Sequence, residues 1–277
     1  MKYKLVCIDM DGTLLGKKHH ISQENIDALR KAHEMGVIIA ICTGRLFYSA
    51  MQYSSVLNIC GPIIASNGTY IRQRGSEEVI HKNPLSTEEV SIIYNVLEKN
   101  NINFYYVNTF DTAMSKHEFP KDHAYVIANE KFKFEKKINL VVDEDILRHV
   151  KEHNGNVLKV IAIEKEDHEK LIKVKEELRS LDMFEVVSSG EDNVEIMKKG
   201  SSKGEAVKIL AQKLNIKREE IICIGDNEND ISMIKFAGLG IAVANGIDEL
   251  KRQANYVTDT NMNSGVAKAI HKFILKK

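Results

Sequence analysis

Three short runs of apolar residues stand out along the chain, at residues 4–8, 37–42 and 221–224. Each run has the length of a strand and lacks the alternation of apolar and polar positions that is typical of a half-exposed strand. Parallel strands that are covered on both faces have this unbroken pattern. The three runs therefore predict strands of one central sheet.

The segments around these runs predict further parts of an α/β core. Residues 22–36 begin with a serine that can cap a helix, continue with an apolar stripe at helical spacing and end in glycine. A helix here completes a βαβ unit with the first two strands. After the second strand, residues 62–66 predict another buried strand, and residues 69–73 and 78–82 predict two strands joined by a turn.

From Pro84 onward the pattern changes. Ser86 and Glu89 have the spacing of a capping box, which indicates a helix that runs to about Lys99. The Lys- and Glu-rich stretch at 124–137 has no clear periodicity. Beyond it, apolar spacing predicts more elements of an α/β unit. Strands are expected at 103–108, 157–163 and 184–188, and a helix is expected at 166–181.

The pattern of the core resumes near Val194. Ser202 and Glu205 have capping-box spacing again, and the helix that they open presents an apolar face before the strand at 221–224 follows. We therefore predict an α/β fold with a doubly wound parallel-sheet core formed by residues 1–83 and 193–277. An α/β domain at residues 84–192 is inserted into this core.

Composition narrows the classes of partner. The chain has 277 residues with 39 Lys plus Arg and 39 Asp plus Glu, so its formal net charge is zero and no overall field attracts nucleic acid or an anionic membrane. The apolar runs are too short to cross a bilayer, and no export signal precedes the first strand. We expect a cytoplasmic protein that is a monomer or a weak homo-oligomer. The four cysteines lack metal-ligand spacing and are expected to be small buried residues.

Two carboxylates follow the first strand, in Asp9-Met10-Asp11-Gly12-Thr13. Ligands of open α/β sheets bind at the carboxyl ends of the strands, and side chains two apart along a strand point the same way. We expect Asp9 and Asp11 to face a site together. The alternative is an ordinary turn at the end of a strand, because Asp and Gly are common turn residues.

The second strand ends in Thr43-Gly44-Arg45. A hydroxyl group and accessible backbone N–H groups at this position suit a phosphate oxygen. A helix cap at Thr43 with Arg45 in a surface ion pair explains the tripeptide equally well.

The strand at 221–224 leads into Gly225-Asp226-Asn227-Glu228-Asn229-Asp230. Clustered oxygen ligands at a strand end suit Mg²⁺, and the absence of a Cys/His cluster in the sequence argues against a softer metal. Helix capping is the competing explanation for Glu228 or Asp230. It does not explain Asp226, which directly follows the buried strand.

Lys203 lies in the first turn of its predicted helix, where a cation opposes the helix dipole at a cost of about 0.3–1 kcal/mol. A nearby anion would compensate for this cost, and a solvated surface lysine is the alternative.

If Asp9, Asp11, Asp226 and a phosphate ester meet, each like-charge pair about 4 Å apart costs about 4 kcal/mol at an effective dielectric constant of about 20. Mg²⁺ and Lys203 together supply three positive charges against this repulsion.

Four motifs, taken in chain order, resemble those of the haloacid dehalogenase superfamily: Asp9-Met10-Asp11-Gly12-Thr13, Thr43-Gly44-Arg45, Ser202-Lys203-Gly204 and Gly225-Asp226-Asn227-Glu228-Asn229-Asp230. The segment Ser66-Asn67-Gly68, the hairpin, the long insertion and the tail at 256–267 are similar to the Cof-type branch, class IIB, which carries a C2B cap domain. Two positions depart from this branch, because Asn255 and the pair Asn263-Ser264 stand where acidic residues are usual. Both positions lie outside the four motifs.

This resemblance implies a role for each motif residue. Asp9 would attack phosphorus and form an aspartyl phosphate, and Asp11 would serve as acid and then as base. Mg²⁺ would be held by the side chains of Asp9 and Asp226 and by the main-chain carbonyl of Asp11. Phosphoryl oxygens would be contacted by the Met10 amide, Thr43, Gly44, Lys203 and Asn229. Asp230 would not bind the metal directly but would hold the water molecules bound to it.

The resemblance favours a Mg²⁺-dependent phosphatase that acts on a small phosphorylated metabolite, such as a sugar phosphate or a phosphorylated cofactor. A phosphomutase and a non-catalytic, phosphate-responsive switch protein are the alternatives. The residues that select the substrate belong to the cap and are not identified by the sequence. His117, His123 and Tyr125 lie in this region, where such residues are more often packing or surface residues than ligands.

Overall fold

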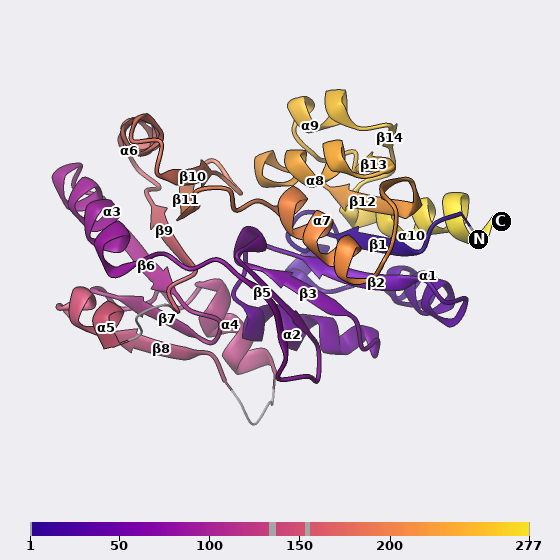
Figure 1. Ribbon diagram of the computed structural model, residues 1–277, viewed down its shortest axis with the longest axis horizontal. Coiled ribbons are helices and arrows are strands. Elements are labelled where there is room, and N and C mark those ends of the chain that lie inside the picture. Colours follow the sequence, from indigo (N-terminus) through magenta and orange to yellow (C-terminus); the bar gives the residue numbers. More distant parts are fainter. Residues whose placement is uncertain (1, 133–136, 153–155, 277) are drawn as a thin grey trace.

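The computed structural model of the chain describes residues 2–132, 137–152 and 156–276, which form two lobes (Figure 1). The first lobe is built on an eight-stranded sheet with the strand order β14-β13-β12-β1-β2-β3-β4-β5. In chain order, its strands are β1 (Leu5–Ile8), β2 (Ile38–Cys42), β3 (Pro62–Ala65), β4 (Tyr70–Gln73), β5 (Val79–Lys82), β12 (Ile221–Gly225), β13 (Leu239–Ala242) and β14 (Tyr256–Val257).

Strand β1 lies at the centre of this sheet, parallel to β12 on one side and to β2 on the other. Alternate residues of β1 face opposite layers of helices: Val6 and Ile8 belong to one apolar cluster, and Leu5 and Cys7 to the other. Helices α1 (Gln23–Glu34), α2 (Phe47–Ser54) and α10 (Gly265–Ile270) contribute to the first cluster, and α7 (Lys203–Lys213), α8 (Ile231–Phe236) and α9 (Asp248–Gln253) contribute to the second. The predicted doubly wound core is thus confirmed.

The helix cap and the hairpin that the sequence predicts for the core are both present in the structure. Ser22 caps α1 by accepting a hydrogen bond from the Asn25 amide, and Gly36 has a positive φ of 91° directly after the helix. The hairpin is formed by β4, which pairs antiparallel with β3, and β5, which pairs antiparallel with β4. Three cysteines are buried as predicted, whereas Cys60 is exposed.

The second lobe contains a six-stranded sheet with the strand order β10-β11-β9-β6-β7-β8. Its strands are β6 (Phe104–Asn108), β7 (Thr112–Ser115), β8 (Asn139–Val142), β9 (Lys159–Ile163), β10 (Phe184–Val187) and β11 (Asn193–Lys198). Its helices are α3 (Thr87–Lys99), α4 (Ala124–Lys131), α5 (Ile146–Glu152) and α6 (His168–Ser180). Helix α3 begins with the predicted capping box of Ser86 and Glu89.

The alternation of residues along these strands separates the two faces of the second sheet. Val160 and Ala162 of β9 pack in the cluster that includes residues of α3, α5 and α6. Ile161 points to the opposite face and joins the cluster of the first lobe, as does Tyr106 on β6. This second face is therefore turned toward the core, and it carries Lys159 of β9 by the same alternation.

The second lobe also differs from the sequence prediction. Strands β7 and β8 and helix α5 were not predicted, and α4 falls within the stretch that had no clear periodicity. β11 was assigned to the core, which was predicted to resume at residue 193, but it pairs with β10 and β9 of the second sheet. The alternation of apolar Val194 and Ile196 with Glu195 is that of a strand with one buried face. The chain returns to the first sheet only after Lys198.

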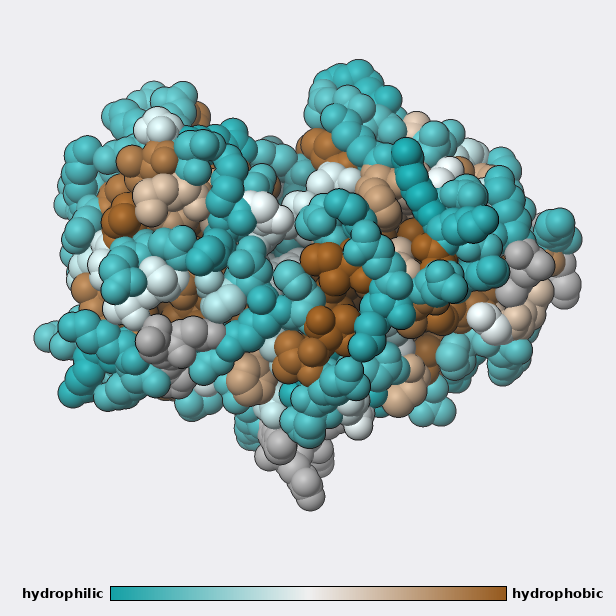
Figure 2. Space-filling model, in the orientation of Figure 1, coloured by the Kyte–Doolittle hydropathy of each residue, from teal (hydrophilic) through white to brown (hydrophobic). Residues whose placement is uncertain are grey.

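In Figure 2 the two lobes meet at an indentation whose visible residues are mostly pale or hydrophilic. Among the described residues, no helix combines the length and the apolar character needed to span a membrane.

The contact between Gly68 and Ser202 generates a test of the packing. Gly68 has a φ of 100°, and a Cβ atom there would overlap the carbonyl oxygen of Ser202 at the start of α7. Gly200 has a φ of 80°, but a Cβ atom there would meet nothing within 4 Å. We expect Gly200→Ala to lower the free energy of unfolding by about 1 kcal/mol, from backbone strain alone. Gly68→Ala should cost at least about 2 kcal/mol more, because the overlap adds to the strain. Urea unfolding followed by circular dichroism measures both, and equal losses would contradict the contact.

Candidate active site

The ends of three adjacent strands bring the sequence motifs together. Asp9 follows β1, Thr43 follows β2 and Asp226 follows β12, and β1 is paired in parallel with both neighbours. Lys203 is the first residue of α7, whose N-terminal turn lies beside the loop at 66–68. The carboxyl edge of the sheet thus holds the predicted acidic, hydroxyl and cationic groups.

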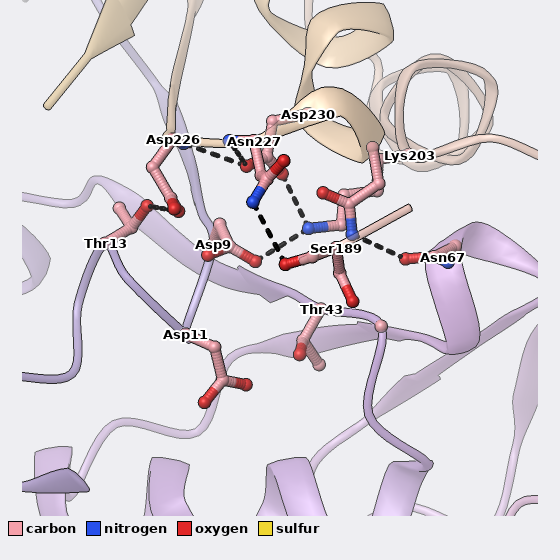
Figure 3. A network of polar contacts seen from close by, with 12 residues as sticks. Asp9, Asp11, Thr13, Thr43, Asn67, Ser189, Lys203, Asp226, Asn227 and Asp230 are labelled. Atoms are coloured by element: carbon pink, nitrogen blue, oxygen red, sulfur yellow. Dashed lines mark hydrogen bonds and ion pairs between the residues drawn. The ribbon is translucent and has the colours of Figure 1, made fainter. Parts of the chain in front are cut away.

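Lys203 is fully buried and pairs with two carboxylates (Figure 3). Its Nζ atom lies 2.7 Å from Asp9 Oδ1 and 2.6 Å from Asp230 Oδ1. Burial by itself would lower the pKa of Lys203, but the attraction of Asp230 and Asp9 outweighs it and raises the pKa. Lys203 is therefore a fixed positive charge, and the anions expected near it are these two carboxylates.

Three buried carboxylates lie together at this point. Oxygen atoms of Asp9, Asp226 and Asp230 lie within 4.8 Å of one another. Burial raises the pKa of Asp9 well above its usual value despite the attraction of Lys203. Burial, together with the charge of Asp230, also raises the pKa of Asp226, to about 7. This concentration of negative charge favours the binding of a cation beside the three carboxylates.

The three carboxylates differ in the partners that they already have. Asp230 is fully engaged, because Oδ1 pairs with Lys203 and Oδ2 accepts hydrogen bonds from the amides of Asp226 and Asn227, at 2.9 and 3.1 Å. Asp226 Oδ1 accepts a hydrogen bond from Thr13 at 2.6 Å. Asp9 Oδ2 is buried and has no hydrogen-bond partner among the described residues. An unpaired buried carboxylate oxygen is costly, so this atom fits a role as a metal ligand or as a nucleophile.

Asp11 lies in the turn after β1, and its carboxylate points away from Asp9 (Figure 3). The expected parallel orientation of the two side chains fails, because β1 ends at Ile8 and strand alternation does not extend to Asp11. Arg45 holds the Asp11 carboxylate in two hydrogen bonds of 2.6 Å each, and His19 Nδ1 lies 3.7 Å from it.

The pair of Arg45 and Asp11 has a definite charge state. Burial opposes the charged form of Asp11, but the attraction and hydrogen bonds of Arg45, with a contribution from nearby His19, outweigh burial and hold the pKa of Asp11 well below its usual value. Because the Asp11 side chain is 45% exposed, water screens part of this effect. Arg45 itself is buried. The surface ion pair considered for Arg45 is thus a partly buried ion pair with the predicted acid/base residue.

A second polar network joins the two lobes above the strand ends. Lys159 Nζ lies 2.9 Å from Glu195 Oε2 and also donates a hydrogen bond to the carbonyl oxygen of Gly44. Asn67 donates to the same Glu195 oxygen and accepts a hydrogen bond of 3.1 Å from Asn229. Lys159 and Glu195 are both buried and come from neighbouring strands of the second sheet. The network therefore connects this sheet to the segment Thr43-Gly44-Arg45 and to Asn229.

These groups surround a cavity of about 440 Å³ between the lobes. Its walls include the predicted site residues Asp9, Asp11, Thr43, Gly44, Asp226 and Asn229. Lys203 contacts Asp9 from behind and lines a neighbouring cavity instead. The Met10 side chain is buried in the core, and Asp230 lies behind Asp226 and Lys203.

Sequence reasoning missed most of the cavity wall that the second lobe contributes. Tyr106, Lys159, Ser189 and Glu195 line the cavity without having been predicted to. Tyr125, which was considered from the sequence and not chosen, lines it as well. A signal existed for Glu195, which is a charged residue between two apolar positions of a strand. The hydroxyl group of Tyr125 accepts hydrogen bonds from the Leu46 amide and from Asn108, at 3.3 and 2.8 Å. No local sequence pattern predicts such contacts between residues that are far apart in the chain.

The sequence matches the haloacid dehalogenase-like hydrolase family over residues 6–270. It is 32% identical to the putative phosphatase YxeH of Bacillus subtilis, over 99% of this chain and 100% of that protein. It is also 32% identical to 5-amino-6-(5-phospho-D-ribitylamino)uracil phosphatase YcsE of the same organism, over 98% of this chain and 96% of that protein. The subclass IIB sugar phosphatase BT4131 superposes with a TM-score of 0.80 at 26% identity, covering 98% of each chain.

The chain belongs to the haloacid dehalogenase-like hydrolases, in the Cof-type branch of subclass IIB. It is a phosphatase, as the four sequence motifs indicated.

The pairing of Asp11 with Arg45 predicts a pH-dependent contribution to stability. A carboxylate with a depressed pKa stabilises the folded state above its unfolded pKa of about 3.9, and this contribution is lost as the pH falls further. We expect Asp11→Asn to lower the free energy of unfolding by about 1 kcal/mol at neutral pH, given the exposure of the side chain. The difference from the wild type should stay level down to about pH 4 and shrink below it. Urea titrations at several pH values measure this, and a difference that grows on acidification would contradict the ion pair.

Proposed function

We propose that this phosphatase hydrolyses small phosphomonoesters through an aspartyl phosphate on Asp9, with Mg²⁺ bound beside it. The observation that carries the proposal is the buried Asp9 carboxylate, which has one oxygen fixed by Lys203 and the other without a partner in the described part of the chain. This carboxylate faces a cavity together with Thr43, Gly44 and Asn229, whose polar groups suit phosphoryl oxygens.

The residues present fit a hard divalent cation. Asp9 and Asp226 offer clustered carboxylate oxygens, with the main-chain carbonyl of Asp11 as the third protein ligand proposed, while Asp230 holds Lys203 and two backbone amides in place. When bound, Mg²⁺ supplies positive charge that offsets repulsion between the carboxylates and the phosphate and polarises the phosphoryl group.

In the first half of the proposed reaction, a carboxylate oxygen of Asp9 forms a bond to phosphorus while the bond from phosphorus to the ester oxygen breaks. Asp11 donates its proton to the departing oxygen, and an alcohol is released. In the second half, Asp11 removes a proton from water, whose oxygen attacks the phosphorus of the aspartyl phosphate. The bond between Asp9 and phosphorus breaks, and inorganic phosphate is released with Asp9 restored.

Asp11 cannot donate a proton while it is ionised beside Arg45. A proton donor needs a pKa nearer to the working pH, and the Arg45 pair lowers the pKa of Asp11 instead. We propose that an anionic substrate in the cavity draws Arg45 toward itself and so frees Asp11 to carry a proton. Arg45 would then couple the arrival of the phosphate group to readiness for proton transfer.

Sugar phosphates and phosphorylated cofactors are the proposed substrate classes. Similar proteins include a sugar phosphatase and a phosphatase for a phosphoribitylamino-uracil, so leaving groups with and without a heterocyclic ring occur among relatives that match nearly the whole chain. A phosphomutase would use the same aspartyl phosphate but return the group to a substrate. A phosphate-responsive switch is less favoured, because Asp11 would activate water and shorten the life of the phosphoenzyme.

A phosphatase panel tests this function directly. Purified chain with Mg²⁺ should release inorganic phosphate from at least one member of a set of sugar, polyol and cofactor phosphates. Asp9→Asn should lower kcat by at least about 1000-fold, since it removes the nucleophile. Asp248→Asn is the matched control. It removes an exposed carboxylate of the first lobe that does not line the cavity, and it should retain activity. Isomerisation of a sugar phosphate without phosphate release would instead indicate a mutase.

Metal binding should depend on pH around neutrality. The pKa of Asp226 is raised to about 7, so a proton competes with the cation below this pH. We expect the increase in Tm produced by Mg²⁺ to be larger at pH 8 than at pH 6 and to disappear in Asp226→Asn. Thermal unfolding with and without Mg²⁺ measures it. An equal increase in Tm at both pH values would exclude Asp226 as a titrating ligand.

A further inference from the structure

A second cavity, of about 430 Å³, lies within the inserted lobe next to the one that faces Asp9. The two cavities share Tyr106, Ala124 and Asp192 as wall residues. Because the cavities adjoin at these residues, the second cavity is the next space that a molecule would meet if it held its phosphate group at Asp9 and extended past Tyr106. None of the site residues predicted from the sequence lines this space.

Aromatic rings form much of the wall of the second cavity. Phe104, Tyr106 and His123 line it, and Phe119 packs edge-on against all three from behind. The ring centroids of Tyr106 and His123 are 5.0 Å apart, and those of Phe104 and Tyr106 are 5.8 Å apart. Rings held this way present fixed faces and edges to a planar guest without further ordering of side chains.

His123 adds a directed hydrogen-bond donor to these rings. Its Nδ1 atom accepts a hydrogen bond of 3.2 Å from the Tyr125 amide, which assigns the proton of the neutral ring to Nε2. Burial, with a smaller contribution from Arg45, lowers the pKa of His123 to about 4. The ring is therefore neutral at pH 7, and Nε2–H can donate to a carbonyl oxygen or a ring nitrogen of a ligand.

The charged residues of this wall are mostly acidic. Four carboxylates line the cavity against one lysine, namely Asp122, Glu164, Glu166 and Asp192 against Lys165. The Glu164 side chain is buried, and its Oε2 atom has no hydrogen-bond partner within the described ranges, although Lys170 lies 3.6 Å away. This balance opposes a second anionic group on the ligand and suits one that donates hydrogen bonds or carries positive charge.

From these observations we infer that the second cavity is a subsite for a neutral or cationic aromatic ring with N–H donors, at the far end of the leaving group. The inference rests on the proposed phosphomonoesterase function, which it narrows to phosphate esters that carry such a ring. Tyr106 and Asp192 line both cavities and would contact the linker between phosphate and ring. Phe104 and His123 would contact the ring itself.

Flavin mononucleotide and D-ribitol 5-phosphate form a matched pair of probes, because they share a ribityl phosphate and differ in the ring system. Pyridoxamine 5′-phosphate supplies a smaller, cationic ring. We expect kcat/KM for at least one ring-bearing ester to exceed that for ribitol 5-phosphate by about 5- to 100-fold, mainly through KM, as is usual for a stacked ring. Ribitol 5-phosphate hydrolysed as well as both ring-bearing esters would overturn the subsite and leave the phosphatase function standing.

Variants assign the preference to the second cavity. Phe104→Leu removes the ring but keeps apolar volume, and His123→Asn keeps an acceptor for the Tyr125 amide but removes the imidazole. Both should bring the ratio of the two kcat/KM values toward one. Tyr94→Leu is the control, since Tyr94 packs on Tyr105 at the other face of the sheet, and its ratio should equal that of the wild type. An unchanged ratio in Phe104→Leu and His123→Asn would overturn the inference.

Binding to Asp9→Asn gives a readout that does not depend on turnover. Flavin fluorescence in the full chain should report a Kd for flavin mononucleotide at least about 5-fold below that of ribitol 5-phosphate, which is measured by competition. If turnover fails but this difference persists, the subsite stands and the proposed reaction falls. The Kd of pyridoxamine 5′-phosphate is measured by the same competition. Equal Kd values for ribitol 5-phosphate and both ring-bearing esters would overturn the subsite whatever the outcome of the phosphatase panel.

Discussion

The buried ammonium group of Lys203 is the constraint on which the rest of this site depends. Asp9, Asp226 and Asp230 bring three carboxylates into one small volume, and Lys203 is the cation that directly pairs with two of them. Removing one partner of a buried ion pair typically costs about 3–5 kcal/mol, because the other charge remains without compensation. The strand ends, the first turn of α7 and the loop at 225–230 must therefore be placed together. The close approach of Gly68 to Ser202 shows how tightly this turn is packed.

The inserted lobe completes the site with charges of its own. Lys159 and Glu195 lie on the face of its sheet that is turned toward the core, and they reach Gly44 and Asn67 there. The fold thus surrounds the Asp9 carboxylate with groups from both lobes. The core supplies the residues that we propose to react, and the inserted sheet supplies walls that a leaving group would meet.

Much of the core could be predicted from the sequence because its signals are local. The apolar run of β1, the cap at Ser22 and the acidic residues after β1 and β12 each carry their meaning within a few residues. The second sheet was harder, because β7 and β8 are short and β8 is partly exposed, so neither gives a long apolar run. β11 was misassigned because the alternation of Val194 and Ile196 with Glu195 predicts a strand but does not show which of the two sheets the strand joins.

The site was predicted unevenly for the same reason. Asp9, Thr43, Lys203 and Asp226 converge because strand ends must converge in a parallel sheet. Partners from distant parts of the chain could not be read in this way. Arg45 was weighed only as a surface residue, and its pairing with Asp11 depends on how two separate turns fold.

The contacts between the lobes differ in chemistry from one side to the other. On one side Phe110 of the inserted segment packs against the rings of Tyr48 and Tyr70. On the other, Lys175 and Arg179 of α6 pair with Glu228, next to the metal-ligand candidate Asp226. Dissolved salt screens ion pairs of this partly exposed kind but leaves aromatic packing intact. Higher ionic strength therefore weakens the ion-pair contact between the lobes and leaves the aromatic contact in place. Salt would thus loosen the lobes at α6 and Glu228 while Phe110 stays packed on the core.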